Sequence, residues 1–434
     1  MNEYDSNRIA DLFKSKGYTQ SFDINNTDCY VLNTCHIREK ATEKVYSDIG
    51  RLKKNYKNKF KPFVIIAGCV AQAENDEMLK REPYIDVVVG PQSYHKIPKI
   101  LSSKNVRRRK INFTEFDVIK KFDDLNTIKN SDSSVSAFIT IQEGCDKFCN
   151  FCIVPYTRGM EHSRSPKDII NEAIQLVSNG VREITLLGQN VNAYKFQENN
   201  KITKLSDLIW ELENIDQLKR IRYTTSHPKD MTDDLINCYK HSKKLMPFLH
   251  LPVQSGSNLV LQSMNRKHTK EEYLKTIDKL LSINPEIGFS SDFIVGYPGE
   301  TEDDFNETLS LITKVKFVNS FSFIYSSRPG TPASNMKMVE TQQQKKRLII
   351  LQNLLKKIQI KKNNQEIGNL KEILVENKLK NQNKYFGRTK DLTPVILSGT
   401  NESDIGNIIW VKIENCNHNS LAGTKKIIES EVAA

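Results

Sequence analysis

Three thiols lie within the segment 144–152, which reads Gly-Cys-Asp-Lys-Phe-Cys-Asn-Phe-Cys. Cys145, Cys149 and Cys152 have C-x3-C-x2-C spacing, and thiolates this close together can hold three corners of a four-iron cluster. The fourth iron is then left without a nearby protein ligand. The spacing therefore predicts an iron–sulfur cluster with one open iron, at which a substrate can bind and be activated.

A structural zinc site is the alternative interpretation of the same cysteines. Structural zinc requires four protein ligands, often as two Cys pairs or with paired His residues. The next candidate ligand is His162, ten residues beyond Cys152, and no second His follows at the usual spacing. Local spacing favours the cluster and leaves zinc open.

Composition limits the class of protein and its environment. A chain of 434 residues with 38% hydrophobic residues predicts two or three globular domains. No apolar run approaches the roughly 20 residues of a membrane helix, and the polar start is unlike a signal peptide, so we expect a cytoplasmic protein that does not contact a membrane. Eight cysteines are too few for a disulfide scaffold of this size, which favours metal or catalytic use in a reducing compartment.

The net charge of +12 is unevenly distributed. Residues 340–390 contain 13 Lys or Arg against 4 Glu. Such a basic segment suits a phosphate backbone, although a solvated helix would have the same composition.

The residues after the thiols strengthen the cluster hypothesis. Residues 153–159 read Ile-Val-Pro-Tyr-Thr-Arg-Gly and residues 161–166 read Glu-His-Ser-Arg-Ser-Pro. Together with 144–152 they resemble the radical S-adenosylmethionine (SAM) enzymes, and most closely the methylthiotransferases that modify tRNA. The resemblance implies that Cys145, Cys149 and Cys152 bind a [4Fe-4S] cluster whose open iron chelates SAM.

Alternating strands and helices surround a second pair of cysteines near the start of the chain. Strands are predicted at 28–33, 63–67 and 86–89, with helices at 3–15, 37–57 and 71–80, which indicates a parallel, doubly wound, Rossmann-like domain. Cys35 and Cys69 each follow a strand, where sites in such sheets lie. We place this domain at residues 1–105.

In the methylthiotransferases this domain binds a second [4Fe-4S] cluster through three cysteines. The resemblance carries over to Cys35 and Cys69, but the third ligand is absent from this chain. It normally precedes a Met-Asn pair that matches Met1 and Asn2, so we expect a chain truncated at its amino terminus, without the first strand. Either the true start lies upstream of Met1, or the shortened chain is genuine and impaired in its second cluster. Cys29 is a poor substitute, because six residues of extended strand span roughly 20 Å.

The central part of the chain, residues 131–364, predicts an incomplete (β/α)6 barrel. Its strands are expected at 137–141, 183–187, 220–225, 248–252, 289–295 and 319–325. Helices lie between them, and the chemistry of such barrels is found at the carboxyl ends of the strands. Residues 104–134, with the basic run 104–110, are interpreted as a linker before it.

Several turns at these strand ends resemble the radical SAM fold. The resemblance implies that Gly188, Gln189 and Asn190 contact the methionine part of SAM. Phe151 packs either on the adenine of SAM or in the core. His227 and His250 are equally well explained as structural groups or as substrate contacts.

After a long basic helix at 340–363, the segment 365–430 resembles a TRAM domain, a small RNA-binding β-barrel. Tyr385, Phe386, Arg388 and Lys390 are the candidates for RNA contact, because such barrels bind single strands with aromatic platforms and basic grooves. Core packing is the alternative for Phe386 in particular. Cys238 and Cys416 have no partners by spacing and are predicted to be buried apolar residues.

The chain as a whole resembles the tRNA methylthiotransferases that act at C2 of N6-isopentenyladenosine beside the anticodon. The resemblance implies two [4Fe-4S] clusters, SAM, tRNA and an electron donor of the flavodoxin or ferredoxin type, in a monomer. Cleavage of SAM would give a 5′-deoxyadenosyl radical that removes hydrogen from C2. A sister enzyme acting on threonylcarbamoyladenosine or on a ribosomal protein remains an alternative, as does a non-catalytic, metal-bearing RNA-binding protein.

Overall fold

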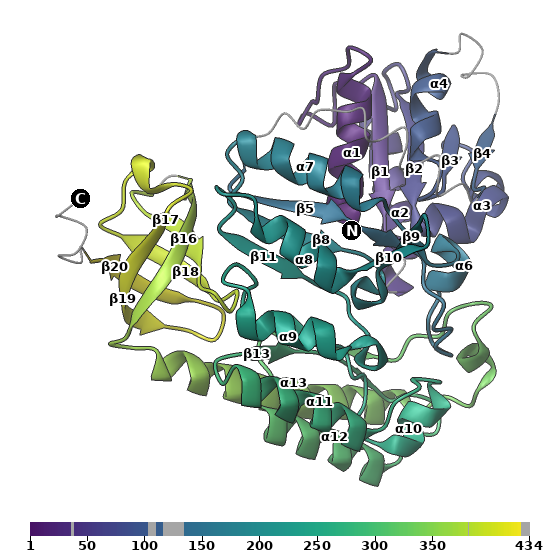
Figure 1. Ribbon diagram of the computed structural model, residues 1–434. Coiled ribbons are helices and arrows are strands. Elements are labelled where there is room, and N and C mark those ends of the chain that lie inside the picture. The colour runs from purple at the N-terminus through teal and green to yellow at the C-terminus, as the bar shows by residue number, and fades with distance from the viewer. Residues whose placement is uncertain (36–38, 103–109, 116–133, 381, 427–434) are drawn as a thin grey trace. The chain divides into compact units, whose positions relative to one another are not determined.

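A computed structural model describes residues 1–35, 39–102, 110–115, 134–380 and 382–426 (Figure 1). The chain forms two units. The first comprises Met1–Ser131, Gln142–Arg164 and Ser326–Asn335, and the second comprises Asp132–Ile141, Ser165–Tyr325 and Met336–Ala434. These units differ from the three domains expected from the sequence, because the cysteine segment 142–164 packs with the amino-terminal sheet.

The first unit contains a parallel sheet with the strand order β1-β2-β3-β4. The strands are β1 (Cys29–Thr34), β2 (Phe63–Gly68), β3 (Val87–Val89) and β4 (Ile111–Phe113). Strand β2 is buried along its whole length, as expected for a central strand covered on both faces. The predicted doubly wound domain is therefore confirmed.

Helices cover both faces of this sheet because successive strand residues point to opposite sides. Helices α1 (Asn2–Lys14) and α4 (Ile97–Ser102) pack on the face formed by Phe63, Ile65 and Ala67. Helices α2 (Glu39–Asn55) and α3 (Cys69–Arg81) pack on the opposite face with Val64 and Ile66. A short helix, η1 (Tyr94–Lys96), precedes α4.

Strand β4 lies inside the stretch that the sequence suggests is a linker. It pairs with β3 in parallel, so the sheet continues beyond residue 105. The basic run at 104–109 lies outside the described residues. The linker interpretation is therefore wrong for residues 111–113.

The cysteine segment of the first unit begins and ends on a small antiparallel pair. Strand β6 (Gln142–Glu143) pairs with β7 (His162–Ser163), and α6 (Val154–Arg158) lies between the cysteines and β7. Gly144 has φ +77°, and a Cβ there would lie 1.9 Å from the carbonyl oxygen of Met160. Glycine is thus required where the chain leaves β6 for the cysteine loop.

The second unit begins with a parallel set of strands. Strands β5 (Ser136–Thr140), β8 (Glu183–Leu187) and β11 (Arg220–Tyr223) pair in the order β11-β8-β5 and lie side by side in Figure 1. A parallel bridge from Ile221 to Leu245 leads on toward β12 (Phe248–His250).

The predicted strand at 289–295 is divided in two. Strand β13 (Gly288–Ser290) pairs with β12, and β14 (Asp292–Val295) pairs with β15 (Phe321–Ile324), all in parallel. A bridge from Gln254 to Phe293 joins the two pairs. The six expected strands are thus present, and the described residues contain no β-pairing between β5 and β15 that would close the barrel.

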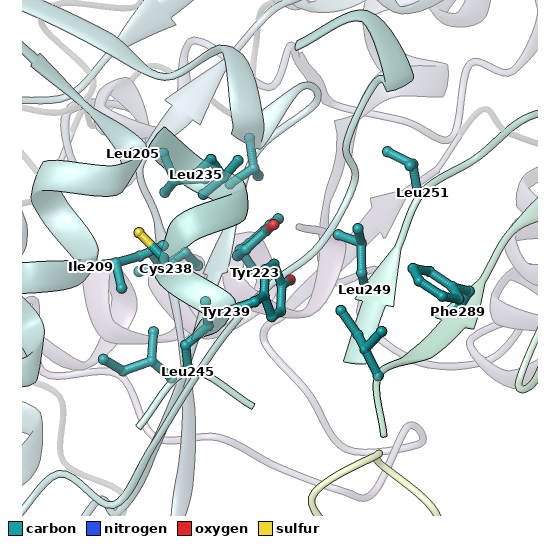
Figure 2. Packing of buried hydrophobic residues seen from close by; sticks show 14 of the residues in the cluster. Leu205, Ile209, Tyr223, Leu235, Cys238, Tyr239, Leu245, Leu249, Leu251 and Phe289 are labelled. Carbon is teal, nitrogen blue, oxygen red and sulfur yellow. The ribbon is translucent and has the colours of Figure 1, made fainter. Parts of the chain in front are cut away.

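Amphipathic helices alternate with these strands and bury their apolar faces against them. They are α7 (Pro166–Ser178), α8 (Leu205–Glu213), α9 (Asp233–His241), α10 (Asn258–Ser263), α11 (Lys270–Ile283) and α12 (Glu302–Val315). Thr269 and Thr301 begin α11 and α12 with capping boxes that satisfy free backbone N–H groups. Figure 2 shows Cys238 among the aliphatic residues of this core, where it is fully buried as predicted.

Shorter elements connect the main ones. In the second unit these are η3 (Val191–Ala193), the hairpin β9 (Lys195–Glu198) and β10 (Lys201–Lys204), and η4 (Pro228–Asp230); in the first unit, η5 (Pro332–Asn335). The long helix α13 (Thr341–Gln365) confirms the basic helix predicted at 340–363.

A closed five-stranded barrel follows α13. Its strands are β16 (Leu370–Lys378), β17 (Tyr385–Arg388), β18 (Pro394–Ser398), β19 (Ile408–Cys416) and β20 (Leu421–Lys425), in the order β16-β17-β18-β20-β19; a short helix, η6 (Glu402–Asp404), precedes β19. Inward-facing aliphatic residues form its core. No described helix is long and apolar enough to span a membrane.

Candidate active site

The three cysteines of the loop lie close together on the first unit. Cys149 is buried, while Cys145 and Cys152 are half-buried. Burial, and then the nearby Cys152, Glu161 and Cys149, raise the pKa of Cys145 to about 12, against a hydrogen bond from the backbone of Lys147. Three sulfurs that interact electrostatically in this way can share one metal cluster.

Backbone and side-chain hydrogen bonds hold the ends of this loop. The N–H of Cys145 donates to the carbonyl of Gly159 (3.1 Å), and that of Cys152 donates to the carbonyl of Cys149 (2.9 Å). Asp146 and Glu161 each accept from the other's backbone N–H, at 3.1 and 3.3 Å. These hydrogen bonds hold the loop that carries the three cysteines at both of its ends.

The residues present fit an iron–sulfur cluster. None of the eight cysteines, all of which are among the described residues, forms a disulfide. Among the described residues, no three His, Cys, Asp or Glu side chains are arranged to hold a single metal ion. A four-iron cluster does not need that arrangement, because each thiolate binds a different iron.

A buried ion cluster connects the cysteine loop to the amino-terminal sheet. The guanidinium of Arg158, at the end of α6, donates to Asp5 Oδ2 of α1 (2.8 Å) and lies 3.7 Å from Glu143 Oε1. The carbonyl of Arg158 accepts from Gln92 Nε2 (3.0 Å). Burial alone would lower the pKa of Arg158, but Asp5, Cys69 and Glu143 together hold it above its ordinary value. The thiol of Cys69 thus lies within electrostatic reach of this guanidinium.

Cys35 and Cys69 lie at neighbouring strand ends. Thr34 of β1 is the register partner of Gly68 of β2, so each cysteine follows one member of an adjacent pair. Gly68 has φ +95°, and a Cβ there would lie 2.2 Å from the carbonyl oxygen of Thr34. This close approach of the two backbones, which only glycine permits, brings the two cysteines together. Residues 36–38 lie outside the described residues.

The position of Cys29 agrees with its predicted exclusion from this site. It begins β1, opposite Phe63, whereas Cys35 follows the other end of the strand. Cys29 is half-buried against the apolar cluster of α1 and α4. At the other end of β1, Asn33 donates its amide to the carbonyl of Asn2 (3.0 Å) and accepts from the hydroxyl of Tyr94 (3.2 Å).

In the second unit, the turn 188–192 is held against the next strand end. The N–H of Val191 donates to the carbonyl of Thr225 (2.9 Å), and Asn190 Nδ2 donates to Asp230 (2.8 Å). Asn192 exchanges two hydrogen bonds of 2.8 Å with the backbone of His227. Gly188 and Asn190 are buried and Gln189 is half-buried, so the predicted SAM-binding turn is rigid.

Unusual backbone angles occur at these same strand ends. Thr225 after β11 has φ +71°, and Gln254 after β12 has φ +78°. A β-branched residue rarely adopts the left-handed region, and such strain is concentrated at functional sites. The strained backbone at Thr225 and Gln254 is consistent with the prediction that the carboxyl edge of the barrel is a functional surface.

Two histidines at this edge were expected, and a third was missed. His250 Nδ1 lies 3.0 Å from Ser290 Oγ, and its Nε2 lies 3.7 Å from Asp292. His227 packs edge-on against His268, with ring centroids 5.6 Å apart. Burial, and then Arg266, lower the pKa of His268 to about 4. The sequence signal was the Arg-Lys-His-Thr run at 266–269, which ends at the cap of α11.

The turn after β14 forms a buried ion pair with α13. Glu300 accepts from the N–H of Gly296 (2.7 Å) and from Arg347 Nη1 (2.8 Å). Burial raises the pKa of Glu300, although both donors oppose that effect. Gln344 donates to the carbonyl of Gly296 (3.0 Å). The long helix thus supports this strand end.

The candidate RNA contacts are corrected by the register of β17. Tyr385 is only 3% exposed and packs in the barrel core, so the prediction that it contacts RNA is wrong. Phe386 and Arg388 alternate with it and face outward, with the Arg388 guanidinium 5.2 Å from the Phe386 ring. Arg388 also pairs with Glu376, and the exposed Lys390 pairs with Glu372.

Two further site predictions have different outcomes. Phe151 is half-buried, and its contact with adenine stays a prediction. Cys416 is only half-buried, and its sulfur lies 3.0 Å from Asn364 Oδ1. Cys416 packs against the barrel core, but the prediction that it is a buried residue is only partly met.

Comparison with known proteins shows the family to which the chain belongs. Models of the Radical SAM superfamily, Uncharacterized protein family UPF0004 and the TRAM domain match residues 139–312, 1–90 and 364–426. A tRNA-2-methylthio-N(6)-dimethylallyladenosine synthase of Pelagibacter ubique is 59% identical, over 99% of this chain and 96% of that protein. The chain belongs to this family. The synthases of Rickettsia canadensis and Wolbachia pipientis subsp. Culex pipiens are 48% and 47% identical, each over 98% of this chain and over 96% and 97% of their own lengths.

This chain shares its fold with distant solved structures. The radical S-adenosylmethionine methyltransferase TsrM of Kitasatospora setae, solved with cobalamin and a [4Fe-4S] cluster, has a TM-score of 0.55 at 11% identity and covers 77% of this chain and 74% of its own. A second TsrM structure, with tryptophan and a SAM analogue, has a TM-score of 0.56 at 11% identity, covering 77% and 72%. The expected amino-terminal truncation finds no support in the alignment with the Pelagibacter synthase, which covers nearly all of both chains.

Proposed function

We propose that this chain catalyses the SAM-dependent methylthiolation of tRNA at C2 of N6-isopentenyladenosine beside the anticodon, giving 2-methylthio-N6-isopentenyladenosine. The observation that carries the proposal is the convergence of Cys145, Cys149 and Cys152 in one fixed loop of a chain that belongs to the synthase family. The adenine C2–H bond is too unreactive for acid–base chemistry by a His or Glu, so a cofactor must supply the reactivity.

Cys145, Cys149 and Cys152 hold the first [4Fe-4S] cluster. When bound, this cluster supplies the electron that converts SAM to methionine and a 5′-deoxyadenosyl radical able to remove hydrogen from C2. The protein's own contribution is position: hydrogen bonds at Cys145 and Cys152 fix the loop. The turn Gly188, Gln189 and Asn190 binds the methionine part of SAM through its backbone.

Phe151 packs on the adenine of SAM. A half-buried aromatic ring next to Cys152 can exclude water from a radical formed there, which limits quenching by solvent. The His227 ring accepts from the N–H of Lys229 (3.2 Å), and His250 Nδ1 lies 3.0 Å from Ser290 Oγ. Both rings are structural groups in this scheme and do not transfer protons.

Cys35 and Cys69 hold the second [4Fe-4S] cluster, which provides the sulfur that is methylated. Arg158 is a buried cation that interacts electrostatically with Cys69. A buried positive charge stabilises thiolates and the negative charge that they share with a cluster. The same residue follows the cysteine loop, so Arg158 contributes to the support of both cysteine groups.

tRNA is bound by the carboxy-terminal barrel, through the outward Phe386 and Arg388 and the exposed Lys390. The target adenine must leave its stack to reach a buried site. We further propose that the enzyme is a cytoplasmic monomer that receives electrons from a flavodoxin or ferredoxin.

Nucleoside analysis of tRNA tests the proposal. A strain that lacks the gene should lose 2-methylthio-N6-isopentenyladenosine, and the wild-type chain should restore it, whereas the C145A/C149A/C152A variant should not. A C238A variant is the matched control, because it removes a cysteine from the barrel core and no proposed ligand. An unchanged nucleoside in the deletion strain would contradict the proposal and favour a different methylthiolation substrate.

Iron analysis after anaerobic reconstitution tests the cofactors separately. Two clusters correspond to about eight irons per chain, and one cluster to about four. The C145A/C149A/C152A and C35A/C69A variants should each lose about half of the iron and sulfide of the wild type. One zinc per chain without iron would instead identify a non-catalytic, metal-bearing RNA-binding protein.

A further inference from the structure

Two buried arginines lie at the amino end of β11. Arg220 and Arg222 are 0% and 3% exposed, and they alternate with Ile221 and Tyr223, which pack in the apolar cluster with α8 and α9. Because alternate strand residues point to opposite faces, both guanidiniums lie on the face of β11 away from that cluster. Large buried cations at this position require a specific set of acceptors.

The acceptors are backbone carbonyls of the carboxy-terminal barrel. Arg220 Nη1 donates to the carbonyls of Arg388 (2.8 Å) and Thr389 (3.1 Å), and its Nη2 donates to that of Glu372 (3.2 Å). Arg222 donates to the carbonyls of Lys390 (2.7 Å) and Thr389 (3.1 Å). Each guanidinium thus donates hydrogen bonds to the carbonyls of two successive residues, a geometry that lysine cannot reproduce.

One buried carboxylate lies close to both cations. Glu183, the register partner of Arg220 on β8, lies 3.0 Å from Arg222 Nε and 3.9 Å from Arg220 Nη1. Burial lowers the pKa of Arg220 to about 10, so the group remains charged at neutral pH. The carboxylates of Glu372 and Glu376 also attract Arg220, and that of Asp391 attracts Arg222; the held carbonyls add partial negative charge.

A second attachment lies at the end of α13. Lys362 pairs with Asp391 at 2.6 Å, and Asn363 Nδ2 donates to the carbonyl of Asn417 at 2.7 Å. Asp391 directly follows the residues whose carbonyls accept from Arg220 and Arg222. The turn 388–391 is therefore bound by both β11 and α13, which belong to the same unit. This barrel is therefore docked rigidly rather than tethered by a flexible linker.

The docked turn also carries the outward RNA candidates. Arg220 holds the carbonyl of Arg388, whose side chain points outward beside Phe386, and Arg222 holds the carbonyl of Lys390. On the basis of the proposed function, we infer that Arg220 and Arg222 are positioning residues for tRNA. They hold the RNA-binding face of the carboxy-terminal barrel at a fixed distance from the carboxyl ends of the strands, where the chemistry takes place.

A positioning role has a different signature from simple tethering. A tethered barrel would still raise the local concentration of tRNA. A docked barrel also sets where the target adenine arrives, and small misplacements of a reacting group cost large factors in rate. Loss of the hydrogen bonds that hold the carboxy-terminal barrel should therefore reduce the turnover of tRNA more than it reduces reactions that need no tRNA.

The test uses the full-length reconstituted enzyme. The E183Q/R220Q/R222Q variant removes the pair of guanidiniums and their carboxylate together, so that no buried charge is left unpaired. K279Q is the control, because it removes the same net charge from an exposed lysine on α11 that pairs with Asp233. R222K is a second, milder variant that keeps the positive charge but loses the several N–H donors of the guanidinium.

In E183Q/R220Q/R222Q, amide hydrogen exchange over residues 388–393 should accelerate while the core strands of the barrel stay protected. The KM for tRNA should rise about tenfold, equivalent to about 1.4 kcal/mol, and less methylthio product should form per 5′-deoxyadenosine. Formation of 5′-deoxyadenosine from SAM without tRNA should stay within about twofold of K279Q. R222K should give an intermediate KM.

Three results would overturn the inference. One is faster exchange in the turn with an unchanged KM and product ratio. Another is an equal loss of tRNA-independent 5′-deoxyadenosine, which would mean a distorted barrel. The third is a wild-type enzyme that neither binds nor modifies tRNA, and in that case the proposed function fails as well. A wild type that modifies tRNA together with an unaffected triple variant refutes only the positioning role.

Discussion

Protonation of His268 should destabilise the second unit as the pH falls. Its ring is 7% exposed, packs against His227 and Tyr273, and lies beside the cation Arg266. Burial, and then Arg266, lower its pKa from 6.5 to about 4. The folded state therefore binds fewer protons than the unfolded state between these values. Stability that is present above pH 6.5 must be lost as the pH falls toward 4.

The size of this effect follows from the two pKa values. The full difference between 6.5 and about 4 corresponds to about 3 kcal/mol. Integration of the proton linkage from pH 7 to pH 5 gives a loss of about 2 kcal/mol from His268 alone. H268Q should lack this contribution, so its unfolding free energy should fall about 2 kcal/mol less than that of the wild type over the same interval.

Urea unfolding monitored by tryptophan fluorescence measures the effect. Both tryptophans, Trp210 and Trp410, lie in the second unit, and a W410F background leaves Trp210 on α8 as the reporter. H241Q is the control, because His241 is an exposed histidine at the end of α9. Hydrogen–deuterium exchange at the imidazole C2 position gives the pKa of His268 directly.

Parallel curves for the wild type and H268Q between pH 7 and pH 5 would refute this reasoning. They would mean that the ring is solvated or that a carboxylate compensates its charge. A directly measured pKa near 6.5 for His268 would refute it equally. Divergence of H241Q from the wild type by a similar amount would show that the pH dependence is not specific to the buried site.

Three further outcomes follow from burial. R158Q should leave two buried carboxylates without their cation and destabilise the first unit by about 3–5 kcal/mol. Amide hydrogen exchange in α1 and α6 measures this loss. R51Q, which removes the exposed arginine of a surface pair, should change the stability of the unit by less than about 1 kcal/mol. Y385A should destabilise the carboxy-terminal barrel by about 3–5 kcal/mol, while F386A should weaken tRNA binding with little change in melting temperature. C238S should cost about 1–3 kcal/mol by placing a hydroxyl in the apolar core shown in Figure 2, and a stability equal to that of the wild type would contradict this.

Local patterns were sufficient for most of the architecture. The alternation of apolar strands and amphipathic helices predicted the doubly wound sheet and the six strands of the open barrel, because burial on one or both faces imposes a period on the chain. The strand at 289–295 was predicted as one element, but its two halves pair with different neighbours. Pairing partners are distant in sequence, so periodicity could not reveal this division.

The candidate cluster ligands were also predicted from the sequence, since a loop that binds a cluster must bring thiols together within a few residues. By itself the sequence thus predicted thiolate ligands at Cys145, Cys149 and Cys152 and the strand-end positions of Cys35 and Cys69. Only the tertiary structure decided that Tyr385 turns inward and Phe386 outward, that Arg158 is buried beside Cys69, and that Arg220 and Arg222 hold the carboxy-terminal barrel. Spacing along the chain specifies local geometry, whereas strand register and contacts between distant segments depend on how the whole chain packs.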